Sequence, residues 1–216
     1  RAITQMLVRR YPQHAVVWRS VNTVQGPGLF DAFRAEGYGW VASRQLYYQW
    51  PADEGFYNHA QRKIQRREAK LLAESPYEVL GPDAIEASMI PRLKDLYDQL
   101  YLRKYSIHNP QFTERFLETA RVERTLGLTA LRHRETGAID GVAGHFVRNG
   151  TLTTPLFGYD LALPQEAGLY RILSYLMYEE AKAHGWLLNM SSGAAEFKRS
   201  RGARPNLEAS MVWDHH

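Results

Sequence analysis

Residues 127–160 read GLTALRHRETGAIDGVAGHFVRNGTLTTPLFGYD, and this stretch decides the fold. It contains three segments rich in the β-branched and apolar residues that are typical of strands. The segments lie at residues 127–134, 138–148 and 151–160. A short loop ending at Gly137 joins the first two, and Asn149-Gly150 joins the last two as a turn whose central positions need positive φ. The stretch therefore predicts three consecutive strands in an antiparallel meander.

A helix and one more strand follow this meander. Residues 168–184 predict the helix, because apolar residues recur at helical spacing and Gly185 supplies a C-terminal stop. Residues 186–191 predict the strand. A strand-helix-strand unit places its strands parallel with a right-handed crossover, and we expect these neighbours to separate at their C-terminal ends. The sequence therefore predicts an α/β fold with a mixed sheet, an antiparallel meander plus one parallel β-α-β crossover, flanked by helices.

The other elements suggest how the chain is divided. Helices are predicted at residues 2–9, 29–37, 58–74 and 194–201 and from Pro91 and Asn109-Pro110 onward, and strands at 15–21, 40–50, 77–80 and 207–213. The two ends of the chain share an order of strand, glycine, helix and strand, either as a true repeat or by chance. We expect residues 1–56 to be the C-terminal remnant of a first unit, residues 57–75 a connector helix, and residues 76–216 a complete unit. Because the chain opens on arginine, we expect it to be a fragment.

The composition is that of a globular protein, since 44% of the 216 residues are hydrophobic and 23% are charged. No apolar run reaches the roughly 18 residues that a bilayer requires, and the first residues lack the pattern of a secretory signal, so we expect a cytoplasmic protein. The absence of cysteine excludes disulfides, zinc-thiolate sites and a thiol nucleophile. The histidines are scattered, so no metal is expected. The sequence does not indicate an oligomeric state.

Positive charge is concentrated on the helix predicted at residues 58–74. The cationic side chains there are Arg62, Lys63, Arg66, Arg67 and Lys70. One interpretation is a surface for a polyanion such as tRNA, and the other is a solvated helix face, which is the usual meaning of such a run. The net charge of +4 is small and suits a phosphate-bearing small molecule.

The C-terminal part of the chain resembles a known family. Residues 169–185 and the run Asn189-Met-Ser-Ser-Gly-Ala-Ala-Glu-Phe-Lys-Arg-Ser-Arg-Gly202 resemble the C-terminal signature of the GNAT-like acyltransferases. These include the Fem-type peptidoglycan aminoacyltransferases and the BioF2-like acetyltransferase domains. The resemblance covers about residues 76–214, and the first 50 residues look like the end of a preceding copy, as in double-GNAT proteins. It implies a GNAT-like fold for both regions.

The resemblance also implies an activity. The expected function is an N-acyltransferase that moves an acyl group from acyl-CoA, such as acetyl-CoA, directly to an amine of a small-molecule acceptor. The absence of cysteine fits direct attack better than a covalent thioester route. Two alternatives stay open, a Fem-type transferase that uses aminoacyl-tRNA and a non-catalytic GNAT-like binding module.

Candidate site residues follow from the needs of acyl transfer, which are a donor site, carbonyl polarisation and proton transfer. The expected donor-binding residues are Gln165, Gly168, Leu169, Tyr170, Asn189 and Ser191. The loop matches the Gln-x-x-Gly part of the family's acyl-CoA motif but places Tyr170 at its third position, and Asn189 and Ser191 stand where the family commonly has aspartate. Without the resemblance, this segment would be a plain strand-to-helix loop.

The catalytic and acceptor-binding candidates lie elsewhere in the chain. Tyr159 and Asp160 end the strand at 151–160 and are candidates for acid and base, while packing and loop capping are their structural alternatives. Lys198 matches a family lysine and lies in a cationic cluster that could hold a phosphate or a carboxylate. The expected acceptor-binding residues, in the loop between two helices, are Lys104, Tyr105 and Asn109.

Overall fold

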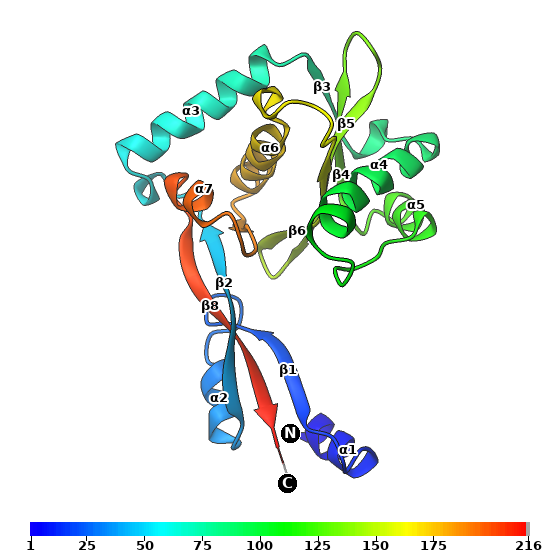
Figure 1. Ribbon diagram of the computed structural model, residues 1–216. Coiled ribbons are helices and arrows are strands. Elements are labelled where there is room, and N and C mark those ends of the chain that lie inside the picture. The colour runs from blue at the N-terminus through cyan, green and yellow to red at the C-terminus, as the bar shows by residue number, and fades with distance from the viewer. Residues whose placement is uncertain (215–216) are drawn as a thin grey trace. The chain divides into compact units, whose positions relative to one another are not determined.

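The computed structural model describes residues 1–214, which form two compact units. Unit 1 comprises Arg1–Gln49, Met190–Arg199 and the chain from Ala203 onward, and unit 2 comprises Trp50–Asn189 and Ser200–Gly202. The two are described separately below, with the element labels of Figure 1.

Unit 2 contains the predicted mixed sheet. Its strands are β3 (Tyr77–Leu80), β4 (Gly127–His133), β5 (Ile139–Arg148), β6 (Thr151–Tyr159) and β7 (Leu187–Asn189). Their order is β7-β6-β5-β4-β3, and every pair is antiparallel except β6 with β7, which is parallel. Asn149 and Gly150 have φ of 50° and 71°, as the β5–β6 turn requires. The predicted meander and crossover are therefore confirmed.

Helices cover both faces of this sheet (Figure 1). They are α3 (His59–Glu74), α4 (Ile90–Tyr97), α5 (Glu114–Val122) and α6 (Leu169–Ala183), together with the π-helical segment η4 (Asp98–Tyr105) that continues α4 and the 3₁₀ turns η1 (Glu54–Phe56), η2 (Pro82–Ala84), η3 (Ala87–Met89) and η5 (Gln165–Ala167). One face buries Leu93 and Leu96 of α4 and Leu117 of α5 in a shared core with Leu156 of β6. On the other face, α6 packs against β5, β6 and β7.

The start of α5 differs from the prediction. Asn109-Pro110 was expected to begin this helix, but α5 begins at Glu114, where the Thr113 hydroxyl accepts a hydrogen bond from the Phe116 N–H at 3.0 Å. Threonine satisfies one of the N–H groups that a helix start leaves free. The Asn109 side chain instead donates to the Tyr101 carbonyl at 2.9 Å, so it fixes the loop that follows η4.

Unit 1 is built on three antiparallel strands with β8 in the middle. The strands are β1 (Val16–Val21), β2 (Gly39–Gln49) and β8 (Arg204–Trp213), and the helices are α1 (Ala2–Arg10), α2 (Leu29–Ala35) and α7 (Ala195–Ser200). The buried residues Val21, Tyr38, Ala209 and Met211 form its core, against which Trp18, Phe30, Phe33 and Trp213 pack.

The expected division of the chain into residues 1–56, 57–75 and 76–216 stays a prediction. In the compact units, strand β8 pairs with β1 and β2 and belongs to unit 1. Helix α3, the expected connector, packs on α6 inside unit 2. Strand pairing between distant segments decides this grouping, and local sequence does not reveal such partners. The origin of residues 1–56 as part of a first GNAT-like unit stays a prediction.

Gly158 lets α4 lie directly on β6. A Cβ at this position would be 2.5 Å from the Leu96 carbonyl and 2.6 Å from the Tyr97 nitrogen, all backbone atoms that cannot rotate away. Only glycine permits this approach, and η4, which follows α4, is thereby held beside the end of β6.

We predict that Gly158→Ala lowers the free energy of unfolding by about 1–3 kcal/mol, because the added methyl must push the α4 backbone off the strand. Urea unfolding monitored by circular dichroism measures this. The matched control is Gly81→Ala, since a Cβ at Gly81 meets no atom within 4 Å and its φ is −81°, which alanine adopts readily. Equal stabilities of the two variants would contradict the role given to Gly158.

Candidate functional site

Strands β6 and β7 part soon after they begin, as the sequence predicts. Their parallel pairing joins Thr151–Thr153 to Leu187–Asn189, where β7 ends, while β6 continues to Tyr159. Alternate N–H groups of a strand point to opposite edges. Beyond Thr153, β6 therefore directs backbone polar groups toward an edge that β7 does not cover, and such groups can bind a ligand carbonyl.

Four tyrosines gather around this end of β6, and we call them the tyrosine cluster. They are Tyr101 and Tyr105 of η4, Tyr159 of β6 and Tyr170 of α6. The ring centroids of Tyr101 and Tyr105 lie 5.9 Å apart, and those of Tyr159 and Tyr170 lie 6.2 Å apart. The π-helical geometry of η4 is of a kind that often occurs at functional sites. Sequence analysis named three of the four and missed Tyr101, whose spacing of four from Tyr105 could have indicated it.

Three hydroxyls of the cluster, those of Tyr101, Tyr159 and Tyr170, are held in their neutral form. Burial, and next the neighbouring tyrosines, raise the pKa of both Tyr101 and Tyr170 to about 12. Burial also raises the pKa of Tyr159, with a smaller contribution from Tyr105. At neutral pH these groups are therefore protonated and can donate a proton.

The contacts of Asp160 match its structural alternative, which is to cap the loop that follows β6. Its Oδ2 accepts from Nη2 of Arg92 at 2.6 Å, and its Oδ1 accepts the Ala162 N–H at 2.8 Å. Arg92 also donates to Asp95 and to the Ile139 carbonyl. Because both carboxylate oxygens of Asp160 have donors, this geometry favours a structural role, and a catalytic one stays a prediction.

The expected donor loop forms a tight turn at the start of α6. Residues Gln165–Ala167 form η5, and Gly168 has φ of 69° and precedes the first helical residue, Leu169. A Cβ on Gly168 would lie 2.9 Å from the Leu71 side chain of α3. The turn therefore needs glycine for two reasons, and α3 covers one side of it. Tyr170 points toward Phe157 and Tyr159 of β6.

Lys198 and Ser191 lie in unit 1, whereas the other site candidates, Asn189 included, lie in unit 2. The Lys198 side chain is 4% exposed, and its Nζ donates to the carbonyls of Ser192 at 2.6 Å and Ser191 at 3.3 Å. It also lies 5.6 Å from the centre of the Tyr47 ring. Ser191 and Ala194 in this loop have positive φ, a backbone conformation that few non-glycine residues adopt. Lys198 therefore stabilises a loop with an uncommon backbone conformation. Burial lowers the pKa of Lys198 to about 8.

The three acceptor-binding candidates differ in their exposure and contacts. Lys104 and Tyr105 are exposed at the end of η4, and Lys104 lines a shallow pocket with Gln99, Arg103 and Leu161. Asn109 holds the loop through the Tyr101 carbonyl, as described above. Lys104 and Tyr105 therefore lie where a ligand can reach them, and Asn109 contributes by fixing the segment behind them.

Two charged groups were missed by sequence analysis. Glu68 lies buried within the cationic run of α3 and forms ion pairs with Arg171 and Arg201. Glu180 lies 3.6 Å from His184 Nδ1 and 3.9 Å from His145 Nε2, and burial lowers the pKa of His145. The sequence offered two signals for them. Glu68 is an acidic residue within a basic run, and Glu180 lies four residues before His184. Among residues 1–214, no group of three or more His, Asp or Glu is arranged to hold a metal ion.

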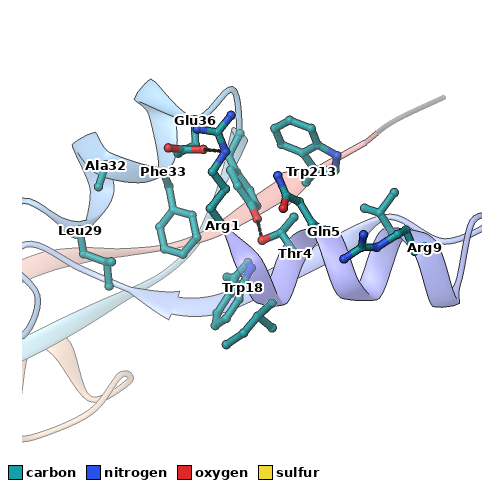
Figure 2. Close-up of a pocket in the computed structure, with 13 residues that line it drawn as sticks. Arg1, Thr4, Gln5, Arg9, Trp18, Leu29, Ala32, Phe33, Glu36 and Trp213 are labelled. Carbon is teal, nitrogen blue, oxygen red and sulfur yellow. Dashed lines mark hydrogen bonds and ion pairs between the residues drawn. The ribbon is translucent and has the colours of Figure 1, made fainter.

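A separate pocket of about 860 Å³ lies in unit 1, lined by α1, α2, β1 and the last residues of β8. Trp18 and Phe33 lie in its wall, where Arg1 points toward Glu36 (Figure 2). Arg1 and Glu36 form an ion pair at 3.4 Å, and the hydroxyls of Thr4 and Tyr38 are hydrogen-bonded. None of the predicted catalytic or donor-binding residues lines it. In the part of the chain that the structure describes, no helix is long and apolar enough to cross a bilayer.

Solved structures share this fold at low sequence identity. L-PGS from Bacillus licheniformis is 13% identical with a TM-score of 0.74, over 99% of this chain and 73% of that one. FemX is 8% identical with a TM-score of 0.68, over 98% and 74% of the two chains. A tandem GNAT protein from the clavulanic acid biosynthesis pathway is 16% identical with a TM-score of 0.53, over 97% and 66%. No protein-family model and no curated protein matches the sequence.

The chain therefore has a GNAT-like fold, as the C-terminal signature indicated. Its mixed sheet with one parallel crossover is the part of that fold in which the tyrosine cluster lies.

We predict that Lys198 makes stability depend on pH. The folded protein releases the Lys198 proton near pH 8, and the unfolded chain releases it near pH ~10.4, so between these values the unfolded state binds more protons. The contribution of Lys198 to the free energy of unfolding therefore rises with pH. Between about pH 7.5 and about pH 9.5, the free energy of unfolding of wild type should rise by about 2 kcal/mol relative to that of Lys198→Met, as measured by urea unfolding. Lys182→Met, at an exposed position of α6, serves as control; a flat difference for Lys198→Met would contradict the prediction.

Proposed function

We propose that this chain is an acyltransferase that moves an acyl group from a thioester or ester donor directly to an amine, and that unit 2 carries the transfer site. The observation that supports this most is the parting of β6 from β7 beside the tyrosine cluster, in a chain with a GNAT-like fold. The part of β6 that does not pair with β7 can polarise a carbonyl, and the tyrosines can supply a proton at the same place.

The chemistry divides between backbone and side chains. The amine nitrogen attacks the acyl carbon, a C–N bond forms, and the bond to the leaving sulfur or oxygen breaks. During attack, negative charge develops on the acyl oxygen. In this mechanism, N–H groups of β6 between Leu156 and Tyr159 donate hydrogen bonds to that oxygen. Backbone donors of a paired strand are already oriented, so little reorganisation opposes the reaction.

A tyrosine transfers the proton in this mechanism. The amine loses one proton and the leaving group gains one, so the reaction balances without any further reactant. Tyr159, whose raised pKa keeps it protonated, gives its proton to the leaving group and is reprotonated by the amine. Asp160 is a poor base here, because Arg92 and the Ala162 N–H already bind it. The donor's phosphates would lie near the first turn of α6, at residues 165–170.

The donor we propose first is an acyl-CoA such as acetyl-CoA, with a small-molecule amine as acceptor. Acetyl-CoA should raise the melting temperature of the purified protein, because a ligand that binds only the folded state stabilises it. Tyr159→Phe should bind the donor as well as wild type does but lose about 10²–10⁴-fold in kcat of acyl transfer, the range for a general acid. Transfer is followed by mass spectrometry with a panel of amines. Absence of a thermal shift at millimolar acyl-CoA would rule out this donor.

The second candidate donor is aminoacyl-tRNA, supported by the exposed basic side chains of α3. Arg66 and Arg67 are exposed, whereas Arg62 donates to the carbonyls of Tyr57 and Glu54, and Lys70 pairs with Glu74. We expect tRNA retention in a filter-binding assay to fall with salt and to weaken in an Arg66→Gln, Arg67→Gln double variant. If acyl-CoA and tRNA both fail to bind, the binding-module alternative is the one that remains.

A further inference from the structure

The pocket described above belongs to unit 1 alone, whereas the proposed transfer site lies in unit 2. Its volume of about 860 Å³ is within the range of roughly 300–1,000 Å³ that is usual for small-molecule sites. The large apolar side chains that line it are Ile3, Val8, Trp18, Leu29, Phe33 and Trp213. Because such a lining gains free energy when apolar surface covers it, the pocket favours a ligand with an apolar body.

A series of contacting aromatic rings forms one wall of the pocket. The ring centroids lie 5.6 Å apart for Trp18 and Phe33, 4.9 Å apart for Phe33 and Tyr38, and 5.3 Å apart for Tyr38 and Trp213. Tyr38 is buried, and its hydroxyl is hydrogen-bonded to that of Thr4 in α1. Rings that hold one another lose little freedom when a ligand packs on them, so this wall is pre-organised for apolar contact.

Part of the apolar lining is open to solvent. Ile3 of α1 is 55% exposed and Leu29 of α2 is 46% exposed, although both line the pocket. Ala32, one turn further along α2, is exposed as well. A ligand can therefore reach the aromatic wall between these two helices, and it would cover exposed apolar side chains as it binds.

The charged residues of the lining leave one positive charge. Arg1 and Glu36 form an ion pair with each other at 3.4 Å. Arg9, in the last turn of α1, is exposed, and no residue in the described part of the chain forms an ion pair with it. Arg1 and Arg9 are eight positions apart, which corresponds to about 12 Å along a helix. Figure 2 shows Arg9 away from the Arg1–Glu36 pair, so the unpaired charge lies at one end of the pocket.

We propose that this pocket binds a free organic monocarboxylate with a hydrocarbon body, the chemical class that includes fatty acids, with its carboxylate at Arg9 and its body against the aromatic wall. The N–H donors of a guanidinium match the two oxygens of a carboxylate. The apolar lining disfavours a ligand that is polar throughout, because its groups would lose water without gaining hydrogen bonds. This binding activity does not depend on the proposed acyl transfer, because every residue that it uses lies in unit 1.

The test titrates hexanoate, octanoate and decanoate into the folded chain at neutral pH, where carboxylates are ionised, and below the concentrations at which they form micelles. Tryptophan fluorescence and the heat of binding are followed, since Trp18 and Trp213 line the pocket. Binding should saturate, and affinity should rise about fourfold for each added methylene. Decanol has the same chain without the charge and should bind at least about threefold more weakly than decanoate. Absence of saturable decanoate binding, or tighter binding of decanol, would overturn the proposal.

Arg9→Gln tests the position of the carboxylate. This variant should bind decanoate about threefold to tenfold more weakly and decanol as wild type does, because only the charged ligand loses a partner. The matched control is Arg10→Gln, which removes an exposed arginine of the same turn of α1 that does not line the pocket. It should bind decanoate as wild type does. Equal losses in the two variants would mean that net charge alone attracts the ligand, and an unchanged affinity in Arg9→Gln would contradict the proposal directly.

A second pair of variants tests whether the ligand lies in this pocket. Ala32→Phe places a ring in the pocket from an exposed position of α2, so it should weaken decanoate binding at least about tenfold. Ala35→Phe, at an exposed position of the same helix outside the lining, should bind as wild type does. Circular dichroism confirms that each variant is folded. Equal decanoate affinities of the two variants would place the ligand elsewhere and overturn the proposal.

A second copy of the chain is the other occupant to be tested for an exposed apolar pocket. Sedimentation velocity is measured over a range of protein concentrations with and without decanoate. Under the proposal, decanoate leaves the sedimentation coefficient unchanged. A dimer that decanoate dissociates in wild type, and that Ala32→Phe fails to form, would show that a second copy covers the pocket and would overturn the assignment to a carboxylate.

Discussion

The parting of β6 from β7 is the constraint on which the proposed transfer site in unit 2 depends. Two parallel strands that stay paired would satisfy each other's backbone groups and leave no place for a ligand carbonyl. Here β7 ends at Asn189 while β6 runs on to Tyr159. Gly158, on the uncovered part of β6, lets α4 lie directly on the strand, and η4 follows from there. The tyrosine cluster is thus a consequence of where a strand loses its partner.

Electrostatics separates the roles of the polar groups in unit 2. Tyr101, Tyr159 and Tyr170 stay neutral because burial raises the pKa of each. Asp160 is held by Arg92 and a backbone N–H, so it stabilises the turn after β6. Glu68 is buried and forms ion pairs with Arg171 and Arg201. The carboxylates are therefore held by arginines, whereas the hydroxyls that can donate a proton lie on other elements.

Local patterns predicted some elements and failed for others, for identifiable reasons. Asn149-Gly150 predicted its hairpin correctly because positive φ at both residues is a local demand. Asn109-Pro110 misplaced the start of α5, since Thr113 supplies the cap instead. Tyr101 was missed because a partly buried tyrosine on a helix is usually interpreted as part of the hydrophobic core. Glu68 was missed because its burial depends on Arg171 and Arg201, which are distant in the sequence.

The sequence by itself determined the meander and the parallel crossover, because strand periodicity, turn glycines and helix stops act over a few residues. The GNAT-like fold was implied by the resemblance of the C-terminal signature. Only the tertiary structure decided that β8 joins β1 and β2, that Lys198 is buried against the carbonyls of its own loop, and that Glu68 is shared by two arginines. Those outcomes arise from pairing and desolvation between segments far apart in the chain, and both depend on the folded arrangement.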